Sequence, residues 1–207
     1  PLNNDNLVLK IDHYSDDFFA NGCRSELRIN TNVGEGHKTE YSFRFLLTDS
    51  FFLNIHNDPW IIIHQWHDKP DPGFTWKNNY RTHPPIVLFI THDSSNNYFL
   101  CFSAGLKRGS LNEKKILKIK RKLQSNKWYT FSCEVLWSLY NVGYAEPKLN
   151  GRYFSSSKNL DDNKIETRNM YNIVPNYFKV GVYRPKDGSI KRTILFDDFY
   201  LESFRCN

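Results

Sequence analysis

The chain has 207 residues and a net charge of +6, with 40% hydrophobic and 24% charged residues. This balance fits a soluble globular protein of one large or two small domains, and no apolar run approaches the roughly 20 residues that cross a bilayer. The excess of positive charge favours anionic partners (nucleic acid, anionic lipid or acidic polysaccharide) without choosing among them.

The chain begins at Pro1 rather than Met and shows no signal peptide, so we interpret it as a processed or trimmed chain, which leaves open a removed export signal. Its four cysteines, Cys23, Cys101, Cys133 and Cys206, match no zinc-binding spacing. Cys101 and Cys133 lie inside apolar runs, which favours buried thiols, and the spacing leaves a disulfide open.

Short runs rich in Phe, Tyr, Val and Ile recur along the chain, and no long segment keeps a helical period. The predicted strands are Leu7–His13, Arg24–Ile29, Glu40–Leu47, Trp60–Trp66, Ile86–Thr91, Tyr98–Ser103, Ile116–Lys120, Trp128–Trp137, Gly143–Leu149, Tyr177–Tyr183 and Thr193–Phe204. Residues 158–170 fit a short helix or an ordered loop. No composition shift marks a boundary, so we predict one domain over residues 1–207, an all-β, two-sheet antiparallel sandwich or jelly roll.

The first informative strand is Gly22–Asn30, with the sequence GCRSELRIN. Because side chains alternate across a strand, Arg24, Glu26 and Arg28 share one face. Glu26 can hold Arg24 in position, and the planar guanidinium can bind a ligand carboxylate. The alternative is an ordinary surface charge pair of little energetic value.

The apolar run that begins at Trp60 ends in the motif Q-W-H, and turn residues follow at Asp68–Gly73. The β-branched run predicts a buried strand, with Gln65 and His67 on the same face. An amide and an imidazole side by side at the end of a hydrophobic strand indicate the centre of a polar cleft. His64 has the opposite parity, so we expect it to be packed or hydrogen-bonded behind the sheet.

The segment Lys107–Lys127 is strongly basic. The favoured interpretation is a solvated edge strand protected by lysines, with Leu117 and Ile119 facing the core. Binding of an anionic polymer is the alternative, and no RNA- or DNA-binding motif accompanies the segment.

The last informative strand is Asn176–Arg184, with the sequence NYFKVGVYR. Its apolar residues lie on one face, and the other face carries Tyr177, Lys179, Gly181 and Tyr183. This second face offers phenols, an ammonium and, at the glycine, a gap where a ligand can approach the backbone. A half-exposed strand with ordinary polar residues is the alternative.

Together these strands supply the groups needed for β-elimination on a uronic acid. Gln65 and Arg24 can donate hydrogen bonds to a carboxylate, Lys179 can hold a negative charge, and His67 and Tyr183 can exchange protons. The proton at C5 is α to the carboxylate, so neutralising that carboxylate stabilises the enolate-like transition state. A base then removes the proton and an acid protonates the leaving glycosidic oxygen. The aromatic residues available to pack against sugar rings include Trp66, Trp76 and Tyr80.

The same motifs resemble those of known polysaccharide lyases. The Q-W-H motif, followed by P-D-P and P-P, resembles the signature of the heparin lyase I-like enzymes, which include the glucuronan lyases. Residues 24–27 resemble the R-S-E-L strand of alginate lyases, and residues 177–183 resemble their Y-F-K-A-G-x-Y strand. Lys179 and Tyr183 also match the K-x-x-x-Y pair of heparin lyase I. With the W-S, N-G and F-D-D-F elements further along, the resemblance covers most of the chain.

This resemblance implies a concanavalin-like β-jelly roll with a substrate groove across its concave sheet, and cleavage of an acidic polysaccharide that leaves an unsaturated uronate. It implies that Gln65 and Arg24 neutralise the substrate carboxylate, with His67 as base and Tyr183 as acid. In some relatives the tyrosine serves as both, and the histidine then orients the substrate. The expected substrate-binding residues are Lys179, Glu26, Tyr177, Arg81, Trp66 and His83. Of these, Arg81 and His83 are expected at the rim of the groove, beside Pro84-Pro85.

The chain leaves little room for the additional lobe of heparin lyase I, which favours glucuronan, alginate or another uronate polymer over heparin. We expect no catalytic metal and no cofactor for the chemistry. Several relatives bind structural calcium, for which Asp197 and Asp198 are candidate ligands, although a surface turn fits either better. We further expect a secreted or periplasmic monomer without nucleic-acid or membrane partners.

Two other functions remain open on the same fold. A non-catalytic carbohydrate-binding lectin needs aromatics and hydrogen bonds, but has no need of Gln65, His67, Lys179 and Tyr183 together. A glycoside hydrolase needs two carboxylates that flank the bond, and Glu26 and Glu40 are the only plausible strand carboxylates near the site. Both are therefore less favoured than a lyase.

Overall fold

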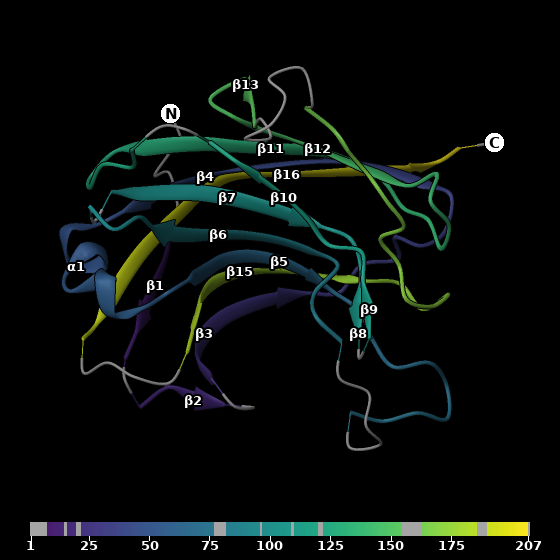
Figure 1. The fold of residues 1–207 in the computed structure, drawn as a ribbon, viewed down its shortest axis with the longest axis horizontal. Helices are drawn as coiled ribbons and strands as arrows, with labels where there is room; N and C mark the ends of the chain where they lie inside the picture. The colour runs from purple at the N-terminus through teal and green to yellow at the C-terminus, as the bar shows by residue number, and fades with distance from the viewer. Residues whose placement is uncertain are drawn as a thin grey trace, which may run out of the picture.

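The structure is a computed structural model that describes residues 8–14, 16–19, 22–76, 82–95, 97–108, 110–119, 122–154, 163–185 and 190–206. Within these residues the chain forms two seven-stranded antiparallel sheets and a separate two-stranded ribbon. Most strands run along the long axis of the molecule (Figure 1). No helix in the described ranges is long and apolar enough to span a bilayer.

The first sheet has the strand order β1-β16-β4-β11-β12-β13, and β14 also pairs with β12. Its strands are β1 (Leu9–His13), β16 (Arg192–Arg205), β4 (His37–Leu47), β11 (Trp128–Leu136), β12 (Tyr144–Leu149), β13 (Arg152–Tyr153) and β14 (Ile165–Glu166). Strand β4 shows the alternation that builds the sandwich, because every second side chain from Tyr41 to Leu47 is buried and points into the core.

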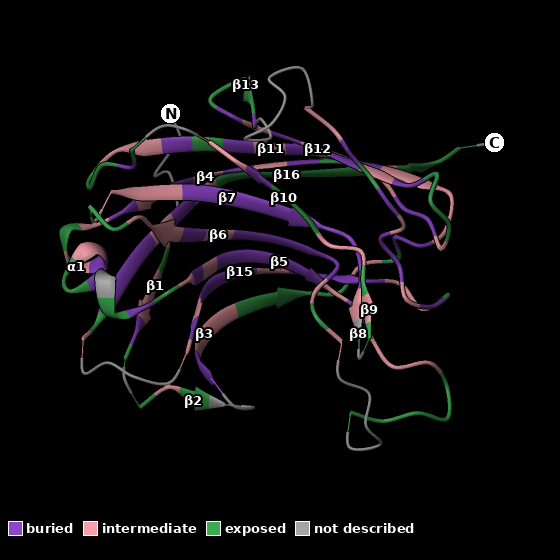
Figure 2. Ribbon diagram, in the orientation of Figure 1, coloured by how far each residue is buried: buried purple, intermediate pink, exposed green. Residues whose placement is uncertain are grey.

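The second sheet has the order β10-β7-β6-β5-β15-β3-β2. Its strands are β10 (Lys115–Lys118), β7 (Tyr98–Ala104), β6 (Ile86–His92), β5 (Ile61–His67), β15 (Tyr177–Arg184), β3 (Gly22–Ile29) and β2 (Phe18–Phe19). The ribbon is β8 (Lys107–Arg108) with β9 (Leu111–Asn112), and two short helices, α1 (Asp49–Phe52) and η1 (Ile55–Asn57), connect β4 to β5. β5 and β15 are largely buried, whereas the end of β3 is exposed (Figure 2).

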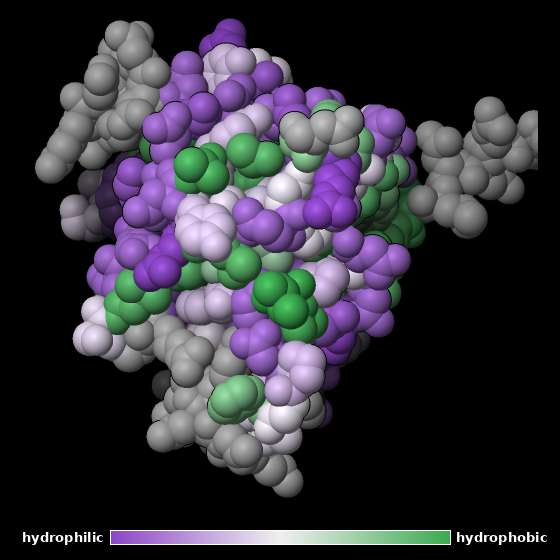
Figure 3. Space-filling view, turned by 90° about the vertical axis from the view of Figure 1, so that its right-hand side faces the viewer, coloured by the Kyte–Doolittle hydropathy of each residue, from purple (hydrophilic) through white to green (hydrophobic). Residues whose placement is uncertain are grey.

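The core between the sheets is aromatic. Phe43, Phe45, Phe102 and Phe131 are fully buried, and neighbouring rings contact one another at tilted or edge-on angles, an arrangement that the ring quadrupole favours. At the end of the sandwich that Figure 3 presents, the hydrophobic side chains outside the grey atoms form small separate groups among polar ones. Burial of the apolar side chains of both sheets therefore drives the packing of the sandwich.

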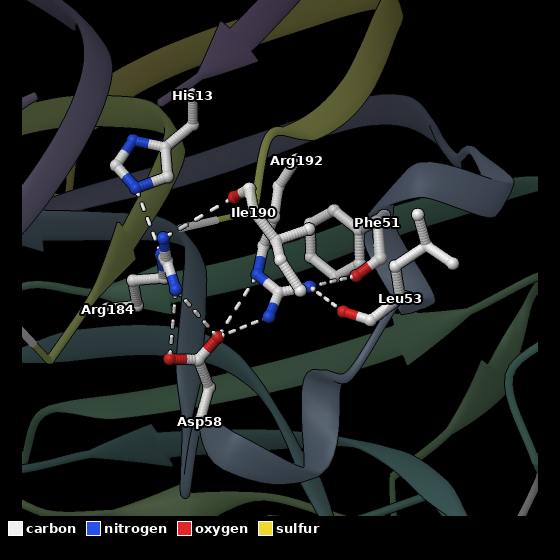
Figure 4. Close-up of polar contacts among 7 residues, drawn as sticks. All are labelled: His13, Phe51, Leu53, Asp58, Arg184, Ile190 and Arg192. Atoms are coloured by element: carbon white, nitrogen blue, oxygen red, sulfur yellow. Dashed lines mark hydrogen bonds and ion pairs between the residues drawn. The ribbon is translucent and has the colours of Figure 1, made fainter. Parts of the chain in front are cut away.

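A buried cluster of charges closes one end of the core (Figure 4). Asp58 accepts hydrogen bonds from Arg184 at 3.2 and 3.3 Å and from Arg192 at 3.1 Å, and all three side chains are buried. His13 accepts a bond from Arg184 Nε at 3.1 Å. Burial, together with the charge of Arg184, lowers the pKa of His13 to about 4. One carboxylate thus joins the ends of β15 and β16 to the segment that follows η1.

The fold confirms the predicted two-sheet antiparallel sandwich, and each predicted strand has its counterpart with ends shifted by a few residues. Strand β10 is an edge strand with Leu117 buried, as predicted for the basic segment. The helix alternative for residues 158–170 is wrong over residues 163–170, where Ile165–Glu166 forms β14. The four cysteines are free thiols, and Cys101 and Cys133 are buried as expected.

Candidate active site

Strand β5 supplies the amide and the imidazole. Gln65 and His67 lie on the outward face of the second sheet, and Trp66 between them points into the core. An irregularity between Ile62 and His64 turns His64 into the core as well. His64 Nδ1 lies 2.8 Å from the carbonyl oxygen of Lys179, and burial lowers the pKa of this imidazole to about 3. The prediction that His64 is held behind the sheet is confirmed.

Strands β15 and β3 complete the outward face beside β5. In the β15–β5 register Tyr177 is opposite His67, and Lys179 is opposite Gln65. In the β15–β3 register Lys179, Gly181 and Tyr183 are opposite Arg28, Glu26 and Arg24 in turn. Because residues directly opposite each other point to the same side, all of these side chains share one face, as the sequence predicts.

The carboxylate of Glu26 occupies the middle of this face. Its Oε1 accepts a hydrogen bond from Gln65 Nε2, and its Oε2 lies 2.7 Å from Lys179 Nζ. The Glu26 side chain is only 5% exposed, so the pair is largely shielded from water. The expected contact between Arg24 and Glu26 stays a prediction, and Lys179 is an ion-pair partner of Glu26 that parity within β3 does not predict. The Oε1 atom of Gln65 is buried and has no hydrogen-bond partner in the described part of the chain.

Tyr183 is held at the other end of the face. The guanidinium carbon of Arg24 lies 4.0 Å from the centroid of the Tyr183 ring, and Trp60 meets the ring edge-on at 5.3 Å. Gly22 lies against the same ring, because a Cβ atom added there would be 2.3 Å from Tyr183 Cε2. Tyr183 thus has three neighbours that fix the direction of its phenol.

His67 lies in a second aromatic group. Its ring stacks on Tyr177 at 5.6 Å with an interplanar angle of 11°, and Trp76 meets it edge-on at 5.3 Å. Arg28 lies over the other ring of the stack, 4.0 Å from the centroid of Tyr177. Burial raises the pKa of Tyr177 to about 12, which keeps this phenol protonated.

Two residues around His67 are absent from the sequence-based site. Asp68 is fully buried, with Oδ1 3.0 Å from His67 Nδ1, and Thr82 donates a hydrogen bond of 2.7 Å to the same oxygen. Asp68 follows His67 directly, so the His-Asp dipeptide is the available signal in the sequence, although the turn residues after it favour the start of a turn. The contact from Thr82 depends on how the loop after β5 folds back, which local sequence does not encode.

His67 and Tyr183 lie far apart along the sheet. Tyr183 follows Tyr177, the partner of His67, by six positions on β15. At about 3.3 Å per residue this places the Cα atoms of His67 and Tyr183 roughly 20 Å apart. The structure thus brings Gln65, Glu26 and Lys179 together in the centre, with His67 at one end of the face and Tyr183 at the other.

Three further expectations have different outcomes. Trp66 is not available to substrate, because its parity buries it completely against Trp137 in the core. The gap expected at Gly181 is filled by the neighbouring strand, since an added Cβ would lie 2.2 Å from the carbonyl oxygen of Ser25.

His83 is exposed, and its backbone N–H donates to the carbonyl of Lys107, at the start of the ribbon. Arg81 lies outside the described residues, as does Tyr80.

The candidate calcium ligands are used in another way. Arg44 Nη1 lies 3.1 Å from Asp198 Oδ2 and 3.8 Å from Asp197 Oδ2. A guanidinium between the two carboxylates occupies the position that a cation would need, so these residues do not fit a calcium site. No group of three or more metal-ligating side chains occurs within the described ranges.

The opposite side of the sandwich carries glutamates that are paired with Lys38 and Lys148. A hollow of about 280 Å³ on the outer face of the first sheet is lined in part by Glu40, Glu134 and Glu146. Glu40 and Glu146 are each directly opposite Glu134 on neighbouring strands. On the second sheet Arg24, Arg28 and Lys179 outnumber Glu26, so the net charge of these four side chains is positive.

The model of the polysaccharide lyase family matches residues 3–200 of the chain. No curated protein sequence matches the chain. The family match spans almost the whole of both sheets and includes every candidate residue on the outward face of the second sheet.

Solved structures of similar fold include lyases. An endo-β-1,4-glucuronan lyase from the fungus Trichoderma reesei is 15% identical, with a TM-score of 0.64 over 97% of this chain and 88% of that one. Alginate lyase AlyC3 in complex with dimannuronate is 14% identical, with a TM-score of 0.60 over 98% and 76%. Alginate lyase A1-II′ of polysaccharide lyase family 7 is 15% identical, with a TM-score of 0.58 over 99% and 82%. At these identities the likeness shows the fold, the jelly roll that the sequence predicts.

Proposed function

The chain belongs to the polysaccharide lyase family, and from this premise we propose that it cleaves a uronic-acid-containing acidic polysaccharide by β-elimination. The observation that carries the proposal is the single outward face on which β3, β5 and β15 bring together Arg24, Gln65, Lys179 and Tyr183. A lectin on this fold requires no such set. The solved lyases of similar fold act on glucuronan and alginate, which supports a uronate polymer as substrate.

The proposed reaction balances without a cofactor. The C5–H bond of the uronate breaks, and its electron pair forms the C4=C5 double bond as the C4–O glycosidic bond breaks. The proton taken from C5 is returned to the leaving oxygen directly or through the solvent. The products are an unsaturated uronate and a new chain end that carries a hydroxyl.

Of the two assignments that the sequence leaves open, we favour Tyr183 as both base and acid. A proton-transfer group must approach within about 3 Å of the atom with which it exchanges a proton. C5 and the leaving oxygen belong to one sugar, whereas the Cα atoms of His67 and Tyr183 lie roughly 20 Å apart along the strands. If Tyr183 serves both proton-transfer steps, the substrate does not have to reach two groups about 20 Å apart. Arg24, which lies over the Tyr183 ring, can neutralise the carboxylate of the same sugar.

The remaining residues of the face then bind the polymer. Lys179 offers a charge already oriented by Glu26, and Gln65 holds the other oxygen of the Glu26 carboxylate. His67, with Tyr177 and Trp76 around it, orients a sugar further along the chain. We also propose that the protein is exported, since polymers of this kind lie outside the cell membrane.

The test is the ultraviolet absorbance of the unsaturated product on glucuronan, alginate, heparin, heparan sulfate, hyaluronan and pectate. We expect a rise on one uronate polymer, and a loss of about 10²–10⁴-fold in kcat for Tyr183→Phe. His67→Ala should raise KM more than it lowers kcat. Tyr144→Phe is the matched control, because its phenol bonds Glu134 on the opposite face.

Other outcomes would revise the proposal. Activity that survives in Tyr183→Phe but disappears in Tyr177→Phe would move the chemistry to the His67 end of the face. Tight binding of one polymer with no absorbance change would favour the lectin. Neither binding nor product on any polymer of the panel would leave a uronate substrate without support.

A further inference from the structure

We propose that Asp68 is the positioning residue for His67, holding the imidazole with Nδ1 protonated so that Nε2 is presented to the polysaccharide. This inference rests on the proposed function, because it concerns how the same face binds its substrate. Asp68 itself is buried under the face and does not touch the substrate side. It would act only through the orientation of His67.

The geometry around His67 Nδ1 determines which ring nitrogen carries the proton. Nδ1 lies 3.0 Å from the Oδ1 atom of Asp68 and 3.1 Å from the carbonyl oxygen of the same residue. Oδ1 accepts a hydrogen bond from Thr82 and a backbone carbonyl can only accept, so Nδ1 is the donor in both contacts. In the neutral ring Nε2 is then an acceptor, and it bonds no residue in the described part of the chain.

Asp68 is fixed from a second direction. Thr82 Oγ1 donates to Oδ1 at 2.7 Å, and Thr82 stands on the far side of the loop that follows β5. The carboxylate therefore ties the end of β5 to the segment that leads into β6. With Tyr177 stacked on one side of the imidazole, the ring plane and its direction are both determined.

The cost of burying Asp68 argues against a purely stabilising role. Its side chain is 0% exposed, and its Oδ2 atom has no hydrogen-bond partner among the described residues. In the same ranges no Lys or Arg pairs with it, and its contacts are the hydrogen bonds from His67 and Thr82. A buried carboxylate that uses only one of its two oxygens destabilises a fold, and a neutral amide of the same shape would cost less. A charge kept at such a site is better explained by its effect on His67.

Removing the Asp68 carboxylate changes the affinity for the polymer in opposite directions under the two possible roles of Asp68, as a positioning residue or as a simple negative charge. If Asp68 acted only through its charge, its removal would strengthen the binding of an acidic polymer. If it positions His67, its removal leaves Nδ1 with only the backbone carbonyl of residue 68, so the other tautomer becomes populated and binding weakens. The loss should be roughly 10-fold, the scale of a hydrogen bond to a charged group.

The experiment uses the full chain carrying Tyr183→Phe, so that substrate is bound without being cleaved. Calorimetry measures the Kd for a glucuronan tetrasaccharide or an alginate tetrasaccharide, according to which polymer the native enzyme cleaves. The variants are Asp68→Asn, Thr82→Val and Thr82→Ser. Asp71→Asn is the matched control, because it removes the same charge from the same loop at a partly exposed position.

Nitrogen-15 NMR of the His67 ring supplies a second readout that needs neither substrate nor turnover. We expect the shifts of an Nδ1-protonated ring in the native chain and in Thr82→Ser, and a mixture of tautomers in Asp68→Asn and Thr82→Val. We expect weaker binding for Asp68→Asn and an unchanged Kd for Asp71→Asn. This readout decides the role of Asp68 even if the lyase assay fails.

The proposal is overturned if the native His67 is protonated on Nε2, or if Asp68→Asn changes neither the tautomer nor the Kd. Tighter binding by Asp68→Asn would reduce Asp68 to a source of negative charge. A circular-dichroism melt of each variant establishes that it is folded, and we expect Asp68→Asn to melt no lower than the native chain.

Discussion

Gly22→Ala displaces the proposed catalytic phenol without removing it. The new methyl group would lie 2.3 Å from Tyr183 Cε2 and 3.2 Å from both Cζ and the hydroxyl oxygen. Ordinary contact requires about 3.5–4.0 Å, so the ring must move by roughly 1.2–1.7 Å. Arg24 and Trp60 pack on the same ring and oppose the movement.

A misplacement of about 1 Å at a reacting group costs on the order of 10²-fold in rate. We therefore expect kcat/KM of Gly22→Ala to fall about 10²-fold, which corresponds to about 2.7 kcal/mol of transition-state stabilisation. The assay is the absorbance of the unsaturated product at several substrate concentrations. A thermal melt run in parallel separates displacement of the ring from loss of fold.

The control and the refuting result are both defined by the structure. Gly34→Ala adds a methyl group with no heavy atom within 4 Å, so it should leave kcat/KM unchanged. If the reasoning holds, Gly22→Ala adds no further loss in a Tyr183→Phe background, because the two changes act on one group. A Gly22→Ala enzyme with native kcat/KM would refute it.

Three further predictions concern stability. Gly181→Ala, at φ +149° and with its Cβ 2.2 Å from a backbone oxygen, should lower the free energy of unfolding by about 3 kcal/mol and Tm by roughly 6–12 °C, against no change for Gly34→Ala. Asp58→Asn leaves two buried guanidinium groups without their counter-charge and should cost about 3–5 kcal/mol in urea unfolding; a loss below about 1 kcal/mol would contradict the buried cluster. Burial lowers the pKa of His64 from 6.5 to about 3, so between these values the unfolded chain binds a proton that the native chain does not, and stability falls as pH falls. The unfolding free energy of His64→Gln should therefore decline less than that of the native chain between about pH 7 and about pH 4. Equal declines in the two proteins would count against a buried, neutral His64.

Much of the fold follows from local pattern. Strands whose apolar residues alternate, such as β4, β11 and β15, are predicted because period-two burial needs only the chain's own residue types. The short strands β8, β9, β13 and β14 are not predicted, because two residues carry no periodicity. Parity also assigns Gln65 and His67 to one face of β5, and Tyr177, Lys179 and Tyr183 to one face of β15. The register between the two strands shows that both sets lie on the same face of the sheet.

The partners of these side chains were decided by tertiary structure. Parity within β3 gives Glu26 a neighbour in Arg24, but the register between β15 and β3 gives it Lys179, and register is a property of two strands together. The same parity excludes Trp66 from the outward face, although as an aromatic residue in the motif it was expected to touch sugar.

By itself the sequence determined the fold class and which residue types share a face on each strand of the candidate site, because alternation and composition are local. Only the tertiary structure decided that His67 and Tyr183 lie at opposite ends of that face, that a loop carries Thr82 back onto Asp68, and that Gly22 makes room for a phenol. These are distances between residues remote in sequence, and they are set by strand register and loop closure, which no single segment encodes.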